Sequence, residues 1–132
     1  QGNYAQAERH VQQALQRYRA IQDPGGEANA LFHLGDIAEA KGDYETSKRY
    51  KTAVLAIAEA IGDISKKAVT LNSLGVLAGH QQEYADARAH LEQALAFYRQ
   101  IGSRRGEGVS LNNLGTNAHI LGDYTQANVF YE

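Results

Sequence analysis

The strongest constraint on the fold is a repeat with a period of forty residues. Tyr4, Tyr44, Tyr84 and Tyr124 recur at this spacing, and most of their neighbours recur with them without a gap. A period between about 20 and 50 residues is typical of solenoids, in which a single unit cannot bury its apolar face and neighbouring units stack to form a core. We therefore predict a single repeat array of about three and a half units over residues 1–132.

The composition argues against several classes of partner. The chain carries 13 Lys plus Arg against 15 Asp plus Glu, and 43% of its residues are hydrophobic. This balance creates no field that would attract nucleic acid or an anionic membrane, and no apolar run approaches the ~20 residues of a membrane span. Since there is no cysteine, disulfides and thiolate metal sites are excluded. We predict a cytoplasmic protein without nucleic-acid or membrane partners, and the lack of methionine suggests a piece of a longer one.

Each unit contains a long amphipathic helix, for example Tyr44 to Ile61. The positions kept from unit to unit, such as Ser47, the Val54-Leu55 pair and Ile61, are spaced by three, four or seven residues, which draws one stripe along a helix. A break follows at residues 22–26, 62–65 and 102–106. There the glycine after the isoleucine suits a helix end, and the neighbouring Asp or Ser suits the N-cap of the next helix.

A second helix in each unit is predicted at about residues 28–41, 68–81 and 108–121. Gly35, Gly75 and Gly115 lie inside it, although an interior glycine costs roughly 1 kcal/mol relative to alanine. The recurrence of a glycine at this position indicates that the partner helix packs closely against it. The short turns that follow, such as residues 42–44, make the two helices antiparallel. Seven helices are therefore expected, with the last one truncated.

The Leu-Gly pair of the first helix, the Gly-Asp-Tyr turn and the later Ala-Leu pair resemble the tetratricopeptide repeat family. The forty-residue form is similar to repeats of spindle-orientation adaptors with GoLoco motifs and of bacterial signal-transduction ATPases and regulators. The resemblance implies an all-α, right-handed α-solenoid of antiparallel hairpins. Its units would be a second helix at 1–22, repeats at 28–61 and 68–101, and a partial repeat at 108–132. Lys51 departs from the apolar pattern, and we expect its stem to cover the core while its charge reaches water.

The resemblance also implies a binding surface on the concave groove, which the first helix of each hairpin lines. Four amides on this face suit hydrogen bonding to a peptide backbone, because Asn both donates and accepts. The expected peptide-binding residues are Asn29, Phe32, His33, Asp36, Val69, Asn72, Ser73, Val76, Val109, Asn112, Asn113 and Thr116.

The predicted function is a non-catalytic scaffold that binds a protein or peptide within a larger signalling or regulatory protein. One alternative is a sensory module that binds a small ligand or signal peptide and controls an attached effector domain. Another is a structural spacer or oligomerisation segment. No catalytic residue is assigned, since His33 and Asp36 share a helix face without a nucleophile beside them. The five histidines show no ligand spacing, so neither a metal nor another cofactor is expected.

The two ends of the array lack the polar cap of a finished solenoid. The apolar stripes at the ends are Tyr4 to Ala14 on one side and Leu111 to Leu121 with Tyr124 to Tyr131 on the other. We expect further repeats of the parent protein to cover them, and the same surfaces predict self-association of the isolated chain.

Overall fold

Six α-helices form the chain in the computed structural model, which describes the backbone of residues 2–131 and the side chains of residues 3–122. The helices are α1 (Gly2–Ala20), α2 (Pro24–Ala40), α3 (Tyr44–Ile61), α4 (Ile64–His80), α5 (Tyr84–Gln100) and α6 (Arg104–Tyr131). No strand occurs within residues 2–131. The expectation of an all-α fold is confirmed.

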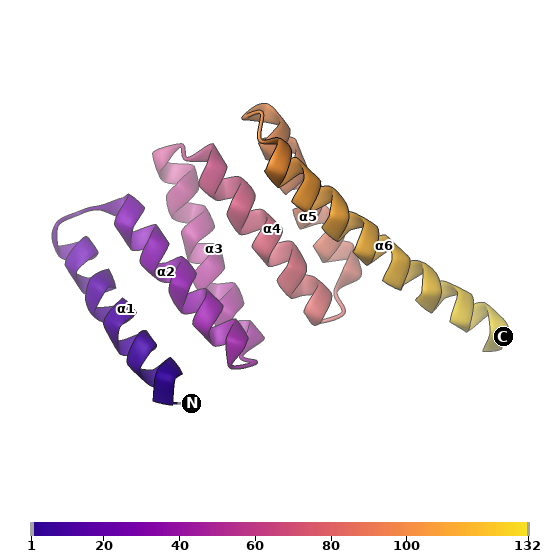
Figure 1. Cartoon of the computed structure of the whole chain (residues 1–132), viewed down its shortest axis with the longest axis horizontal. Coiled ribbons are helices and arrows are strands. Elements are labelled where there is room, and N and C mark those ends of the chain that lie inside the picture. Colours follow the sequence, from indigo (N-terminus) through magenta and orange to yellow (C-terminus); the bar gives the residue numbers. More distant parts are fainter. Residues whose placement is uncertain (1, 132) are drawn as a thin grey trace.

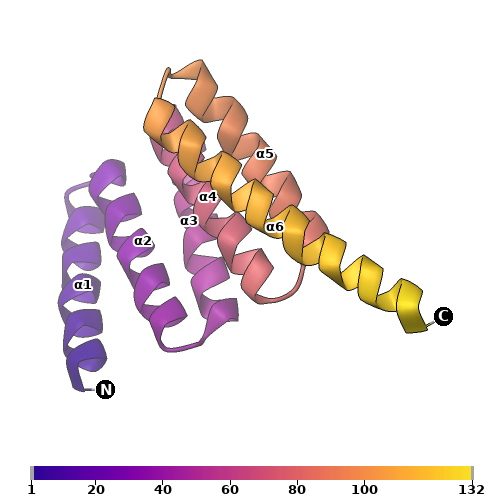
Figure 2. The same ribbon diagram turned by 45° about the vertical axis from the view of Figure 1, so that its right-hand side comes forward.

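The helices stack in chain order as antiparallel hairpins. Helices α2 and α3 form one hairpin and α4 and α5 the next, while α1 packs on α2, α3 on α4 and α5 on α6. In Figure 1, α2, α4 and α6 face the viewer, and α3 and α5 lie behind them. Figure 2 shows α1 and α6 again at opposite ends of the stack. The fold is therefore an α-solenoid with one face formed by the even-numbered helices.

Side-chain caps mark the starts of α2, α3, α4 and α6. Asp23 and Asp63 accept hydrogen bonds from the backbone N–H groups of Gly26 and Lys66, and Ser103 accepts one from Gly106. These caps confirm the roles predicted for the Asp and Ser residues of the breaks. They also explain why α2, α4 and α6 begin four residues earlier than predicted. In the hairpin turn, hydrogen bonds donated by Thr46 hold the pKa of Asp43 below its ordinary value.

Each break after α1 to α5 contains one residue in the left-handed region of backbone conformation. Gly62 and Gly102 adopt φ values of 72° and 71°, as predicted for helix-terminating glycines. Gln22 and Gln82 occupy the same region, with φ values of 57° and 63°. A side chain in this region is strained, because its Cβ approaches the following carbonyl oxygen.

Gln82→Gly should therefore raise the free energy of unfolding by about 0.5–1 kcal/mol, since glycine adopts this conformation without the steric cost. Gln100→Gly is the matched control, because Gln100 is an exposed residue in the last turn of α5. There the same substitution should lower stability by about 1 kcal/mol. Chemical denaturation measures both changes, and a loss of stability in both variants would contradict the strain at Gln82.

The predicted close approach at the interior glycines is confirmed at two of three positions. A Cβ added to Gly75 would lie 2.7 Å from Leu91 Cγ and 3.2 Å from the Ala87 carbonyl oxygen. A Cβ at Gly35 would lie 3.0 Å from Lys51 Cγ. At Gly115 nothing lies within 4 Å, because no helix covers this side of α6 in the described part of the chain.

The seventh helix is not confirmed, because α6 continues through the turn predicted at residues 122–124 (Figure 1). In the earlier hairpins the chain turns back because a full apolar stripe packs the second helix onto the first. Only the first nine residues of such a stripe follow the turn here. The side chains of Tyr124 and Tyr131 lie outside the described residues.

Candidate functional site

The twelve predicted peptide-binding residues lie four each on α2, α4 and α6, the helices that form one face of the stack (Figure 1). None of them is buried. The exposed members are Asn29, His33, Asp36, Val69, Val109, Asn112 and Thr116, and the half-buried members are Phe32, Asn72, Ser73, Val76 and Asn113. Seven of them line one of two clefts, one in each gap between even-numbered helices: Asn29, Phe32, His33 and Val69 line the first, and Val76, Asn113 and Thr116 line the second.

The first cleft lies between α2 and α4 and has a volume of about 430 Å³. Phe32 and His33 line it from α2, and Val69 lines it from α4. Lys66 donates a hydrogen bond from Nζ to Asn29 Oδ1, which links the two helices at the edge of the cleft. An aromatic ring, an imidazole and an ammonium group therefore line an open space of mixed polar and apolar character.

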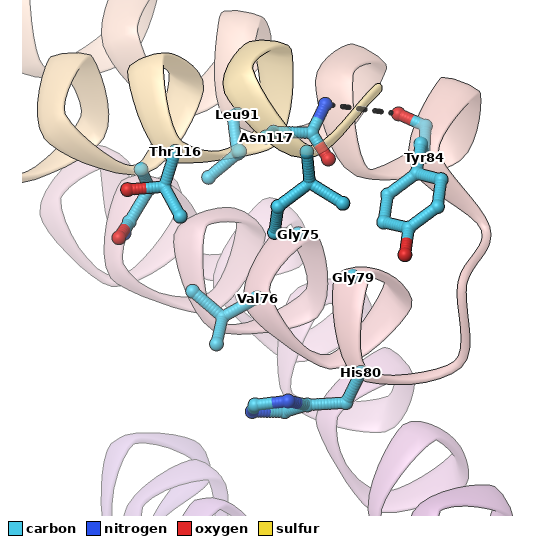
Figure 3. A pocket seen from close by; sticks show the side chains of 10 residues that line it. Gly75, Val76, Gly79, His80, Tyr84, Leu91, Thr116 and Asn117 are labelled. Atoms are coloured by element: carbon cyan, nitrogen blue, oxygen red, sulfur yellow. Dashed lines mark hydrogen bonds between the residues drawn. The ribbon is translucent and has the colours of Figure 1, made fainter. Parts of the chain in front are cut away.

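The second cleft lies between α4 and α6, has a volume of about 160 Å³, and reaches down to α5 (Figure 3). Its apolar lining comes from Val76, Leu91 and Ile120. Asn117 is 8% exposed and donates a hydrogen bond from Nδ2 to the Tyr84 carbonyl oxygen at 3.1 Å, drawn dashed in Figure 3. This bond holds α6 against the start of α5 and closes one end of the cleft.

The forty-residue period explains the apolar lining of the second cleft. Leu91 and Gly79 line it, and their equivalents in the preceding unit are Lys51 and Glu39. In the first gap, the long side chains of Lys51 and Glu39 fill the equivalent space with an ion pair. In the second gap, Leu91 and Gly79 stand at these two positions and leave the space open.

Lys51 is the most buried charged residue described, with 1% of its side chain exposed. Its Nζ lies 3.1 Å from Asp36 Oδ1 and 2.9 Å from Glu39 Oε1, and it donates a hydrogen bond to Ser73 Oγ at 2.6 Å. It also lies 5.2 Å from the centre of the Phe32 ring. The expectation that its charge reaches water is wrong, because the two carboxylates compensate it inside the gap between α2 and α4.

Two of the predicted amides bond to each other. Asn72 Oδ1 accepts hydrogen bonds from Asn113 Nδ2 at 3.2 Å and from the buried Ser110 hydroxyl at 3.3 Å. These bonds join α4 to α6. Substituting Asn72 would therefore alter helix packing as well as the surface, so these amides are poor sites for a binding test.

Sequence reasoning missed the residues that shape the second cleft: Gly79, His80, Tyr84, Leu91, Asn117 and Ile120. The available signal was a change of chemical class between units. Asn117 replaces the apolar Ile37 and Leu77, and Gly79 replaces Glu39. His80 also stacks on Tyr44 of the previous hairpin, with ring centres 5.8 Å apart.

Two features are absent from the described residues. No cluster of three or more His, Cys, Asp or Glu side chains among them is arranged to hold a metal ion. Within the same part of the chain, no helix combines the length and the apolar character needed to cross a membrane.

Comparison with known proteins identifies the repeat. The sequence model of the tetratricopeptide repeat matches residues 1–60 and 66–132. No curated protein matches the chain. Among solved structures, BtubC (BKLC) from P. vanneervenii is similar over 97% of this chain, with a TM-score of 0.81 and 20% sequence identity. The chain spans about half of that protein, 54% of its length, so this likeness concerns the fold alone.

Proposed function

The chain belongs to the tetratricopeptide repeat family, and from this premise we propose that it binds a peptide segment of a protein partner along α2, α4 and α6. Repeats of this family commonly mediate protein–protein interaction and are generally non-catalytic. The observation that supports the proposal is the pair of clefts between successive helices of this face. We place the array in a right-handed solenoid within a larger cytoplasmic regulatory protein.

The size and lining of the second cleft define what it accepts. Its 160 Å³ is well below the roughly 300–1,000 Å³ of sites for small molecules. Val76, Leu91 and Ile120 provide an apolar interior, while Asn113 and Thr116 lie beside it with hydrogen-bonding groups. The cleft therefore suits one apolar side chain of a partner, and Asn113 and Thr116 can bond to the partner's backbone beside it.

The first cleft suits a polar or acidic neighbour of that apolar residue. Lys66 contributes a positive charge at its edge, and the exposed Arg104 and Arg105 begin the next even-numbered helix. The Asp63 carboxylate also lines this cleft, where it caps α4 by accepting a hydrogen bond from the backbone N–H of Lys66. Asp36 is already paired with Lys51, so its charge is largely compensated. The proposed partner is therefore a peptide that combines an apolar anchor with one or more carboxylates.

Gly79→Leu should abolish peptide binding without destabilising the fold. A Cβ at Gly79 meets nothing within 4 Å, and Gly79 lines the second cleft, so a leucine there fills the space meant for the partner. Helix propensity favours leucine over glycine by roughly 1 kcal/mol or slightly less. A random-peptide display library selected on the unmodified chain provides the ligands, and fluorescence anisotropy measures their dissociation constants. We expect the dissociation constants for Gly79→Leu to be at least tenfold higher than for the unmodified chain.

Ala85→Leu is the matched control, because Ala85 is exposed on α5 and is not among the cleft residues. It adds a leucine of the same size and should leave the dissociation constants unchanged. The proposal fails if no peptide is selected, or if selected peptides bind Gly79→Leu as well as the unmodified chain.

The sensory alternative is favoured by one observation, the 430 Å³ of the first cleft, which lies within the range of small-molecule sites. It predicts that a small anionic compound raises the melting temperature of the chain. Substituting Lys66 by Gln should remove that shift. The spacer alternative predicts neither a selected peptide nor a melting shift.

A further inference from the structure

An open cleft of about 360 Å³ lies between α1 and α3, which both pack on α2. Its lining residues are Arg19 from α1, Leu31 from α2, and Thr46, Arg49, Tyr50 and Ala53 from α3. None of the twelve predicted peptide-binding residues is among them. Two arginines line this space and no carboxylate of the described residues does, so we call it the basic cleft.

Arg49 is held at the wall of the basic cleft by its own helix. Its Nη2 donates a hydrogen bond to Thr46 Oγ1 at 3.1 Å, one turn earlier in α3. The Asp43 carboxylate interacts electrostatically with Arg49, but it caps α3 by accepting a hydrogen bond from the Thr46 backbone N–H. Among the described residues, no carboxylate forms an ion pair with Arg49. Because a guanidinium has five N–H donors in a planar fork, most of those of Arg49 stay available to an anion.

Two further donors line the basic cleft above an apolar floor. Arg19 pairs with Glu27 through Nε at 3.1 Å, which uses part of its fork and leaves it other N–H groups. The Tyr50 side chain is half-buried, and its hydroxyl forms no hydrogen bond within the described part of the chain. Leu31, which is 4% exposed, and Ala53 form the floor. The basic cleft therefore combines two cations and a free hydroxyl with a small apolar surface.

The repeat does not require the polar residues of the basic cleft, because the next unit lacks them. Forty residues later, the positions of Arg19, Thr46, Arg49 and Tyr50 are occupied by Glu59, Asp86, Ala89 and His90. The apolar floor is kept, since Leu71 corresponds to Leu31. The ion pair of Arg19 also recurs, as Arg99 with Glu107 at 2.9 Å, so Arg19 has a role in the fold as well. Arg49 and Tyr50 are therefore the residues at which a ligand is best tested.

From these contacts we propose that the basic cleft binds the phosphoryl group of a phosphate monoester. Such a group carries a charge of about −1.5 to −2 at neutral pH and three acceptor oxygens, so it matches two guanidiniums and a hydroxyl better than a singly charged carboxylate does. Arginine binds phosphate through paired, charge-assisted hydrogen bonds. The volume of the cleft lies within the roughly 300–1,000 Å³ of small-molecule sites, and its apolar floor accepts the organic part of the ester.

Phenyl phosphate is the probe, because it joins a phosphoryl group to a small apolar ring, and isothermal titration calorimetry measures its dissociation constant. Arg49→Gln should raise this constant by about tenfold or more, since it removes a charge-assisted hydrogen bond. Tyr50→Phe keeps the packed ring, removes only the hydroxyl, and should raise the constant by about three- to tenfold. Arg9→Gln is the matched control, because Arg9 occupies the equivalent position on α1, is exposed and does not line the basic cleft. It should leave the constant unchanged, and circular dichroism should show all three variants folded.

Two further ligands define the chemistry and the source of the bound group. Benzoate carries a carboxylate on the same ring and should bind at least about tenfold more weakly than phenyl phosphate. A peptide with one phosphotyrosine that binds more tightly than phenyl phosphate assigns the basic cleft to a modified protein partner, and otherwise a free phosphate monoester is the ligand.

The proposal is independent of the peptide site, so Gly79→Leu should bind phenyl phosphate like the unmodified chain. It is overturned if phenyl phosphate at about 10 mM does not bind, or if benzoate binds equally well. It is also overturned if Arg49→Gln leaves the affinity for phenyl phosphate unchanged, or lowers it no more than Arg9→Gln does.

Discussion

Gly75→Ala should lower the free energy of unfolding by about 1–3 kcal/mol, whereas Gly115→Ala should raise it by up to about 1 kcal/mol. The two residues occupy equivalent positions forty residues apart. At Gly75 the new Cβ would lie 2.7 and 2.8 Å from two carbon atoms of the buried Leu91, which is the situation of an overpacked core. At Gly115 the Cβ meets nothing within 4 Å, so only the higher helix propensity of alanine remains.

Gly35→Ala provides an intermediate case. Its closest neighbours are carbon atoms of the Lys51 side chain at 3.0 and 3.1 Å, so the overlap is smaller than at Gly75. The change that Gly35→Ala makes to the free energy of unfolding should fall between the changes made by Gly75→Ala and Gly115→Ala. Urea denaturation at micromolar concentration, where self-association is weakest, measures all three. Equal effects at Gly75 and Gly115 would show that α5 does not pack over Gly75 as described.

The fold was predictable because its determinants repeat. Three copies of the same apolar spacing, with Gly35, Gly75 and Gly115 in register, distinguish a stack of hairpins from an arbitrary helical bundle. Helices α2, α4 and α6 begin four residues before the predicted positions, whereas α3 begins at Tyr44 as predicted. Asp23, Asp63 and Ser103 were recognised as caps, but the residues directly after them were assigned to the break instead of to the first helical turn.

The candidate site was less predictable, because it depends on residues that do not repeat. The face was found from its position in the repeat, but the second cleft depends on Gly79 and Leu91, whose significance appears only when they are compared with Glu39 and Lys51 across the gap. The bond between Asn72 and Asn113 joins positions 41 residues apart. Periodicity identifies which helix face a residue occupies and does not reveal such a pairing of side chains.

Lys51→Ala should be among the most destabilising single changes in the chain, at about 2–3 kcal/mol. It removes a 1% exposed side chain that packs under Gly35, and it leaves two neighbouring carboxylates without their cation. The cost stays below that of a fully buried pair, because Asp36 and Glu39 are 52% and 28% exposed and water can solvate them. Lys48→Ala, at an exposed position on the same helix, should change stability by less than about 0.5 kcal/mol.

The combination Asp36→Val, Glu39→Ala and Lys51→Leu should be within about 1 kcal/mol of the unmodified chain, or more stable. A buried ion pair contributes little relative to well-packed apolar residues of similar volume, since the desolvation of its charges offsets their attraction. The gap between α4 and α6 already contains the apolar version, with Val76 and Leu91 at the equivalent positions. Strong non-additivity is therefore expected: Lys51→Leu alone should cost more than the triple change, because it leaves the two carboxylates facing a leucine. If the three changes instead add up to the sum of the single effects in urea denaturation, the side chains around Lys51 do not act as one compensated cluster.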